Sequence, residues 1–239
     1  MSIVAGLIAL TVFSAEVPAE ITYMVGTVHI QRGGQMYSGV LNAKLYVNDV
    51  VTTKDDSECE IQFSNYSLVR LQPNSSIKIE RKEETETGVF HRLFASIGSI
   101  ITKVTKLNQG DEYELRTETA QAFIRGTTFK TEVDTTGTSS FSVFEGKVGV
   151  KSLLEGAAEL LLDQNFKSSI AEGQLSPVMD QLSDLEISEF NNIFKDFLDR
   201  GAALDELKKK LEEEKEKIEE DIEEKKDDLL NKGKGLFNK

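Results

Sequence analysis

The chain has 239 residues, 41 acidic and 28 basic, so its formal net charge is −13 at pH 7. Binding to nucleic acid needs a basic patch, and the basic residues here are interleaved with acids, which excludes that class of function. The only cysteine, Cys59, excludes an intramolecular disulfide. The length allows one domain with additional segments, or two small domains.

Residues 1–19 resemble a targeting segment. The apolar run Ile3–Phe13 has the length of a signal-peptide core and is short for a membrane span. We predict a signal peptide or an N-terminal anchor, cleaved after Ala15 or Ala19, or retained. The chain is then exported to the periplasm or cell envelope, and this segment is its one expected membrane contact. The alternative is a buried first strand or helix.

Residues 20–175 contain short runs in which apolar and polar residues alternate, separated by turn residues. Such spacing predicts a mainly β domain, either a β-sandwich or a short solenoid-like β-stack. The first run starts at Ile21 and shifts parity across Gly26, which predicts a glycine bulge. A hairpin turn is predicted at Gln31–Gln35.

The middle of this region contains one ambiguous and one charged stretch. Glu80–Gly88 is charged and is predicted to be a loop. Phe90–Lys106 begins with helical spacing, but its context favours a strand. Cys59 shares a strand face with Ile61 and Phe63, which predicts a small buried side chain, with a reactive thiol as the alternative.

Ala120–Val150 is the most regular stretch. Odd positions from Phe123 to Val133 are β-branched, aromatic or long, which predicts a half-buried strand with these side chains on one face. Gly126 interrupts the run and predicts a bend or a close backbone approach. A turn at Asp134–Thr138 and a corner at Glu145-Gly146 separate the strands that follow.

The same stretch resembles the FecR-domain family. Its signature is an Arg-Gly-Thr-x-Phe strand followed by a Glu-Gly-x-Val corner. Other family segments have counterparts in the same order at Val25–Val28, Leu45–Thr53, Ile61–Ile79, Ser96–Ile101 and Ala171–Gln174. The positions that match family motifs, which we expect to be structural, are Gly26, Asp49, Gly98, Arg125, Gly126, Thr127, Phe129, Glu145, Gly146 and Gly173.

Two positions depart from the family pattern. Asn48 stands where glycine is usual before Asp49, and Asn65-Tyr66 stands where Asp-Gly is usual. Asparagine tolerates a left-handed backbone better than most residues, so we expect the turn at Asn48 to survive. Tyr66 lies in a turn that favours glycine, so we do not expect that turn to keep the family geometry.

Arg125 is the polar motif residue with two interpretations. In the structural one it is buried or half-buried and pairs with a carboxylate, Asp49 or Glu145. In the functional one it contacts an anion or a partner.

Residues 176–239 change character and are predicted to be a linker and a long charged helix, a possible coiled coil. Ser183 followed by Glu186 has the spacing of a capping box. Residues 205–228 are mostly charged, with apolar residues at an eleven-residue repeat that favours a straight or slightly right-handed stripe. The alternatives are a solvated spacer helix, weak homo-oligomerisation through a coiled coil, and a partly disordered tail.

No arrangement for catalysis, cofactor binding or metal binding is evident. His29 and His91 have no Cys or His partner at ligand spacing. No glycine-rich loop opens a helix to bind phosphate, and no calcium loop is present. We therefore expect no cofactor and a protein that is not an enzyme.

The resemblance implies an extracytoplasmic β-domain that receives or relays signals by binding other envelope proteins. In the best-known members a cytoplasmic sigma-regulating segment and a transmembrane helix precede this domain. Neither is seen here, so sigma-factor regulation is not expected to carry over. The prediction is a non-enzymatic exported module for signalling or scaffolding, with β-augmentation as a mode of binding. The alternative is a domain that binds a small ligand or a cell-wall polymer.

Overall fold

The computed structural model describes residues 19–63, 67–85, 88–104, 111–124, 126–195 and Lys226. The chain divides into two units, Met1–Leu182 and Ser183–Lys239, which are treated separately below. Residues 1–18 of the predicted signal peptide, the turn at Tyr66 and most of the predicted charged helix lie outside the described residues. Within the part that is described, no helix is long and apolar enough to cross a membrane.

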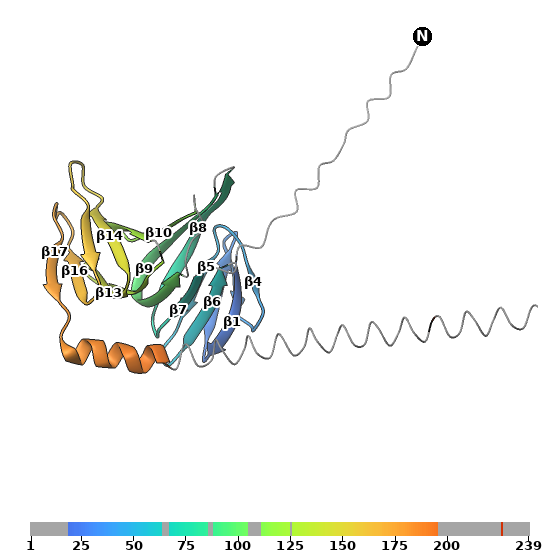
Figure 1. The fold of residues 1–239 in the computed structure, drawn as a ribbon. Helices are drawn as coiled ribbons and strands as arrows, with labels where there is room; N and C mark the ends of the chain where they lie inside the picture. The colour runs from blue at the N-terminus through green and yellow to red at the C-terminus, as the bar shows by residue number, and fades with distance from the viewer. Residues whose placement is uncertain are drawn as a thin grey trace, which may run out of the picture. The chain divides into compact units, whose positions relative to one another are not determined.

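The first unit is mainly β, as predicted, and its described residues form one 17-stranded mixed sheet, whose arrangement is shown in Figure 1. Its strands are β1 Ala19–Val25, β2 Val28–Arg32, β3 Gln35–Ser38, β4 Lys44–Leu45, β5 Val50–Thr53, β6 Glu58–Phe63, β7 Ser67–Leu71, β8 Ser76–Thr85, β9 Gly88–Val104, β10 Glu112–Arg116, β11 Ala120–Ile124, β12 Thr128–Val133, β13 Ser139–Glu145, β14 Lys147–Ser152, β15 Leu160–Asp163, β16 Phe166–Ile170 and β17 Val178–Gln181.

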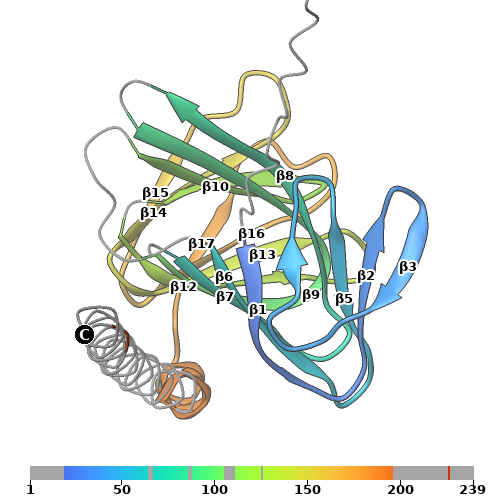
Figure 2. The same cartoon turned by 90° about the vertical axis from the view of Figure 1, so that its right-hand side faces the viewer.

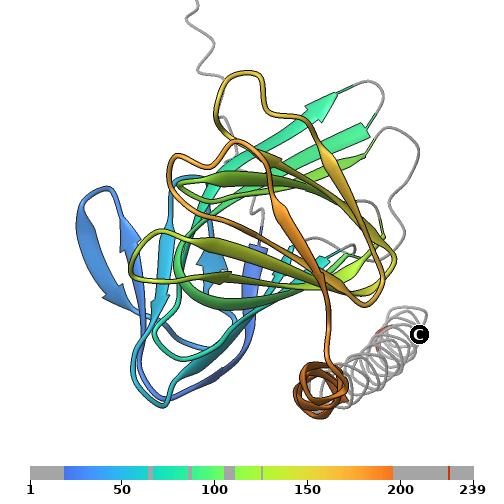
Figure 3. The same ribbon diagram turned by 90° about the vertical axis from the view of Figure 1, so that its left-hand side faces the viewer.

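The strands form two layers that share β9. Layer A runs, in order of pairing, through β4, β1, β6, β7, the C-terminal half of β9, β12, β13, β16 and β17. Layer B runs through β3, β2, β5, β8, the N-terminal half of β9, β10, β11, β14 and β15. The pairing of β9 with β10 is parallel, which makes the sheet mixed. Figure 3 views the end where the yellow and orange strands lie.

β9 changes layer at Gly98. Residues up to Ile97 pair with β8 in layer B, and residues from Gly98 pair with β12 in layer A. Gly98 has φ +99°, and a Cβ there would lie 2.6 Å from the Cβ of Ser75. The Ser75 hydroxyl accepts a 2.9 Å hydrogen bond from the Ser99 N–H, which fixes the bend. A glycine is therefore required at this corner, because the φ angle is positive and there is no room for a Cβ.

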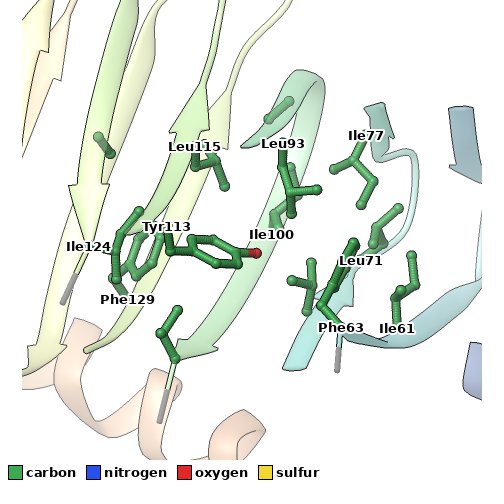
Figure 4. Packing of buried hydrophobic residues seen from close by; sticks show 14 of the residues in the cluster. Ile61, Phe63, Leu71, Ile77, Leu93, Ile100, Tyr113, Leu115, Ile124 and Phe129 are labelled. Atoms are coloured by element: carbon green, nitrogen blue, oxygen red, sulfur yellow. The ribbon is translucent and has the colours of Figure 1, made fainter. Parts of the chain in front are cut away.

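The hydrophobic core lies between the layers. Figure 4 shows Leu93 and Leu115 of layer B facing the same interior as Leu71 and Ile100 of layer A, and all four are buried. Alternation along each strand places one set of side chains inward. Burying a side chain of this size stabilises the fold by about 1.5–3 kcal/mol, so the interior supplies the main driving force for folding.

The predicted bulge at Gly26 is wrong: this glycine turns the chain from layer A to layer B. It has φ +73°, and a Cβ would lie 3.0 Å from the Cα of Ser57. The Ser57 hydroxyl accepts a 2.8 Å hydrogen bond from the Thr27 N–H. The register shift in this region occurs earlier, between Ile21 and Tyr23. The parity change in the sequence therefore reflects a change of layer.

Two predictions for the middle of the domain have opposite outcomes. Phe90–Lys106 was predicted to be a strand, and β9 confirms this over Gly88–Val104. Glu80–Gly88 was predicted to be a loop because it is charged, but β8 continues to Thr85 and pairs with β9 as far as Gly88. The loop prediction is therefore wrong. Backbone hydrogen bonds form a hairpin without apolar side chains, so a charged stretch can still be a strand.

The alternating run from Phe123 to Val133 is divided between the two layers. β11 ends at Ile124 in layer B and β12 begins at Thr128 in layer A. Gly126 has φ +66° and forms the bend that the sequence predicted. Phe123 is 39% exposed, whereas Phe129 and Val133 are buried. The single face predicted from the sequence is therefore wrong at Phe123, because the backbone turns before the pattern ends.

The second unit is helical from 184 to 195 within the described residues. The Ser183 hydroxyl accepts a 3.3 Å hydrogen bond from the Glu186 N–H, and the Glu186 carboxylate accepts a 2.9 Å bond from the Ser183 N–H. This is the predicted capping box, and it is confirmed. Phe190 and Phe194, one helical turn apart, stack with ring centroids 5.1 Å apart.

Candidate functional site

The two parts of the FecR-like signature meet at one corner. Gly126, between β11 and β12, and Gly146, between β13 and β14, both have positive φ, +66° and +82°. A Cβ on Gly146 would lie 2.7 Å from the carbonyl oxygen of Gly126. The two backbones therefore approach closely only because Gly146 lacks a side chain. We call residues 126–128 with 145–147 the signature corner.

Hydrogen bonds of two threonines hold the signature corner. The Thr127 hydroxyl donates a 2.8 Å bond to the Lys147 carbonyl, and the Thr128 hydroxyl donates a 3.1 Å bond to the Glu145 carboxylate. Thr127 and Thr128 are both buried, and Phe129, next along β12, is in the core. The corner thus joins two hairpins, and its polar groups have partners within it.

Asp49 lies at a second site, in the turn before β5. Its carboxylate accepts bonds from Arg32 Nε at 2.8 Å and Arg32 Nη2 at 2.7 Å, and from the Tyr46 N–H at 2.8 Å. The Arg32 guanidinium lies 4.5 Å from the centre of the Tyr46 ring. Asn48 has φ +74°, so the predicted left-handed turn at this position is confirmed.

The remaining motif positions are separate from these two sites. Gly26 and Gly98 are the layer-changing corners described above. Gly173 has φ +75° with open space around it, in the turn after β16. Arg125 lies outside the described residues, so its predicted pairing stays a prediction. Of the two carboxylates considered for it, Asp49 is bound by Arg32.

Neither the cysteine nor the histidines form a reactive cluster within the described residues. Cys59 is buried, as predicted, and burial together with the nearby Glu60 carboxylate raises the pKa of its thiol to about 12. His29 lies in β2 and His91 in β9, where the His91 ring is 6.2 Å from that of Tyr113. In the described part of the chain, no group of three or more His, Cys, Asp or Glu side chains is placed to hold a metal ion.

The edge of layer B presents an exposed strand, which follows the hairpin turn predicted at Gln31–Gln35. β3 pairs with β2 and, among the described strands, with no other. All of its residues are exposed, and Met36 is 63% exposed. Tyr37 and, after the strand, Val40 and Leu41 are also exposed large side chains. Figure 2 shows β3 as the outer strand of its hairpin. We call Gln35–Leu41 the β3 edge.

The geometry of the hairpin sets the direction of the β3 backbone groups. Gly33 and Gly34 form a two-residue turn with φ +57° and +82°, and Arg32 pairs with Gln35. In such hairpins the pair next to the turn exchanges hydrogen bonds, and the following pair does not. Met36 therefore directs its N–H and C=O away from β2, where another strand can add. The hairpin turn predicted at Gln31–Gln35 is therefore confirmed.

A two-layered, mainly β domain with this signature corner matches a known family. Residues 49–149 match the family model described as FecR protein, which confirms the resemblance based on the motifs.

Two crystal structures of "a putative anti-sigma factor from Parabacteroides distasonis ATCC 8503", at 1.65 Å and 2.50 Å resolution, are similar to this chain at 14% identity. Their TM-scores are 0.48 and 0.49, and the alignments cover 58% and 59% of this chain. The same alignments cover 62% and 63% of the two solved chains, so this chain spans less than two thirds of their length. No curated protein matches the sequence.

Proposed function

We propose that this chain is a non-enzymatic, exported module that binds other proteins of the cell envelope, in signalling or in scaffolding. The FecR domain over residues 49–149 supports a regulatory role. The observation that carries the proposal is the β3 edge, where the outward backbone N–H and C=O of Met36 pair with no described strand and lie beside exposed apolar side chains. A partner strand that pairs with β3 gains backbone hydrogen bonds and buries these side chains.

Capture of partners from the envelope fraction of cells tests the binding mode. The full chain is used as bait in its original form and with Met36→Pro, which removes the outward N–H while keeping an edge position that tolerates proline. Met36→Glu tests the apolar contact, and Met179→Glu on β17 is the matched control, because Met179 is similarly exposed at 48% on another edge.

The proposal expects a reproducible partner with the original chain and with Met179→Glu, and its loss with both Met36 variants. Equal recovery with all four chains would overturn binding at the β3 edge. Recovery of no protein by any bait would overturn the partner-binding function and favour binding of a small ligand or a cell-wall polymer.

Export is a separate part of the proposal, supported by the apolar run Ile3–Phe13. Cell fractionation followed by N-terminal sequencing tests it. The expected product is found in the envelope or periplasm and begins after Ala15 or Ala19, or keeps residues 1–19 as a membrane anchor. A chain recovered from the cytoplasm with an intact N-terminus would contradict it.

A further inference from the structure

A row of paired residues crosses the outer face of layer B. Glu114 in β10 pairs with Phe123 in β11, Phe123 pairs with Gly149 in β14, and Gly149 pairs with Leu161 in β15. Paired residues on neighbouring strands point to the same side of a sheet. Phe123 is 39% and Leu161 55% exposed, and the glycine between them leaves a gap in the row.

This gap belongs to a cavity of about 720 Å3 that Glu114, Phe123, Gly149, Glu159 and Leu161 help to line. We call it the layer B groove. Its volume falls in the range of binding sites for small molecules and peptide side chains. The Glu159 carboxylate lies over the glycine, because a Cβ on Gly149 would come within 2.9 Å of its Cδ. Gly149 thus allows Glu159 to reach the floor of the groove.

The carboxylates of the groove are not fully satisfied. Glu114 is only 2% exposed, and Arg92 donates to its Oε2 from Nε at 2.8 Å and lies 2.7 Å from it through Nη2. Its Oε1 is buried and accepts no hydrogen bond from the described residues, and Arg116 Nε is 4.0 Å away. A buried oxygen without a donor is unfavourable, so a ligand that donates a hydrogen bond here would be stabilised.

The other charges leave the groove negative. Glu112 and Glu159 also line it, and neither forms an ion pair with the described residues. The lysine in the lining, Lys147, is 2.7 Å from Asp163 and is therefore neutralised. Exposed Phe123 and Leu161, a glycine inside a strand and an unsatisfied carboxylate are each unfavourable for the domain alone. A ligand with a cationic group on an apolar body would pair with the carboxylates and cover the exposed apolar side chains.

We propose that the layer B groove binds a segment of a partner protein that carries Arg or Lys beside large apolar side chains. The inference rests on the proposed partner-binding function and names a second contact surface and its chemistry. The cationic group lies near Glu114 and Glu159, and the apolar side chains lie between Phe123 and Leu161. A peptide segment fits better than a single amine because the cavity is larger than one side chain.

Fluorescence anisotropy with the full chain tests the groove directly. The probe is a fluorescein-labelled hexapeptide, Arg-Phe-Arg-Leu-Arg-Phe, and its counterpart with Glu in place of each Arg. Glu159→Gln removes one charge, and Gly149→Ala fills the floor by displacing only the end of the Glu159 side chain. Glu132→Gln is the matched control, because Glu132 is an exposed carboxylate on β12 in layer A. Circular dichroism verifies that each variant is folded.

The expected result is binding of the basic peptide that weakens about tenfold in Glu159→Gln and in Gly149→Ala, and is unchanged in Glu132→Gln. Binding should also weaken as salt rises from about 0.05 M to about 0.5 M. Equal affinity for all variants, preference for the acidic peptide, or no binding of either peptide would overturn the proposal.

The same groove variants used as bait in envelope capture separate this inference from the proposed function. Loss of the partner in Glu159→Gln and Gly149→Ala supports the groove as a contact surface. A partner that is retained by these variants and lost by Met36→Pro leaves the proposed function standing and overturns the groove.

Discussion

The signature corner and the layer B groove share Gly146 and Lys147, but the rest of each region is built in an opposite way. In the signature corner, Thr127 and Thr128 are buried, and their hydroxyls donate to groups of the same corner. In the groove, Phe123 is exposed and the Glu114 carboxylate keeps one oxygen without a hydrogen bond within the described residues. One region is complete by itself, and the other has unsatisfied groups.

This difference indicates where recognition resides. The residues that identify the family form backbone corners, and replacing them should disturb folding before binding. The groove residues Phe123, Glu159 and Leu161 do not belong to the family motifs and contribute little to the core. A family signature can therefore identify the scaffold while the specificity for a partner is set elsewhere.

The largest expected effect is at Gly146, compared with a glycine of the same conformation. Gly146→Ala should destabilise the domain by about 3 kcal/mol or more, because a left-handed φ and a close approach to Gly126 act together. Gly156→Ala should cost only about 1 kcal/mol, since Gly156 has φ +81° with open space around it. Urea unfolding measures both. Equal costs would show that the close approach does not matter.

The next effect contrasts an ion pair whose carboxylate is buried with a pair in which both side chains are exposed. Asp49→Ala removes three hydrogen bonds, two of them from Arg32, and should lower the free energy of unfolding by about 2–4 kcal/mol. Asp163→Ala breaks the exposed pair with Lys147 and should cost at most about 0.5 kcal/mol. Urea unfolding of the two variants provides the test, and similar losses would contradict the distinction.

A substitution in the layer B groove should hardly change the stability of the domain. Glu159→Gln replaces an exposed carboxylate that has no ion pair among the described residues, so the free energy of unfolding should stay within about 0.5 kcal/mol of the original value. Thermal and urea unfolding of the full chain measure this. A loss as large as that of Asp49→Ala would place Glu159 in the scaffold and weaken the contrast.

The smallest effect is a pH dependence at a turn of the scaffold. The Thr136 hydroxyl, with the N–H groups of Thr136, Gly137 and Thr138, lowers the pKa of Asp134 below its ordinary value. A lowered pKa in the folded state gives stability that is present above the unfolded pKa, about 4, and lost as pH falls through the folded value. The stability difference between the original chain and Asp134→Asn should therefore be constant above pH ~5 and shrink below pH ~4. A difference that grows on acidification would contradict this.

Local signals in the sequence were sufficient for the turns and caps. The Asp134–Thr138 turn, the left-handed Asn48 and the capping box of Ser183 with Glu186 follow from side chains that bond to nearby backbone. The bend at Gly126 was also predictable, because a glycine in an alternating run marks a break.

The sequence did not predict which strands pair with each other. The alternation from Phe123 to Val133 continues through Gly126, so the pattern alone does not reveal that the two halves lie in different layers. The groove depends on a register that places Phe123 beside Gly149 and Gly149 beside Leu161. Alternation defines the two faces of each strand, but it does not say which strands are neighbours.

The most direct test of this account measures stability and binding of two variants side by side. Thr127→Val removes the bond to the Lys147 carbonyl at nearly constant volume, and Glu159→Gln changes the groove. The account predicts that Thr127→Val loses about 1–3 kcal/mol of stability and binds the basic peptide normally, whereas Glu159→Gln keeps its stability and binds about tenfold more weakly. If Thr127→Val weakened binding while fully folded, or Glu159→Gln left binding unchanged, the separation between scaffold and recognition surface would be contradicted.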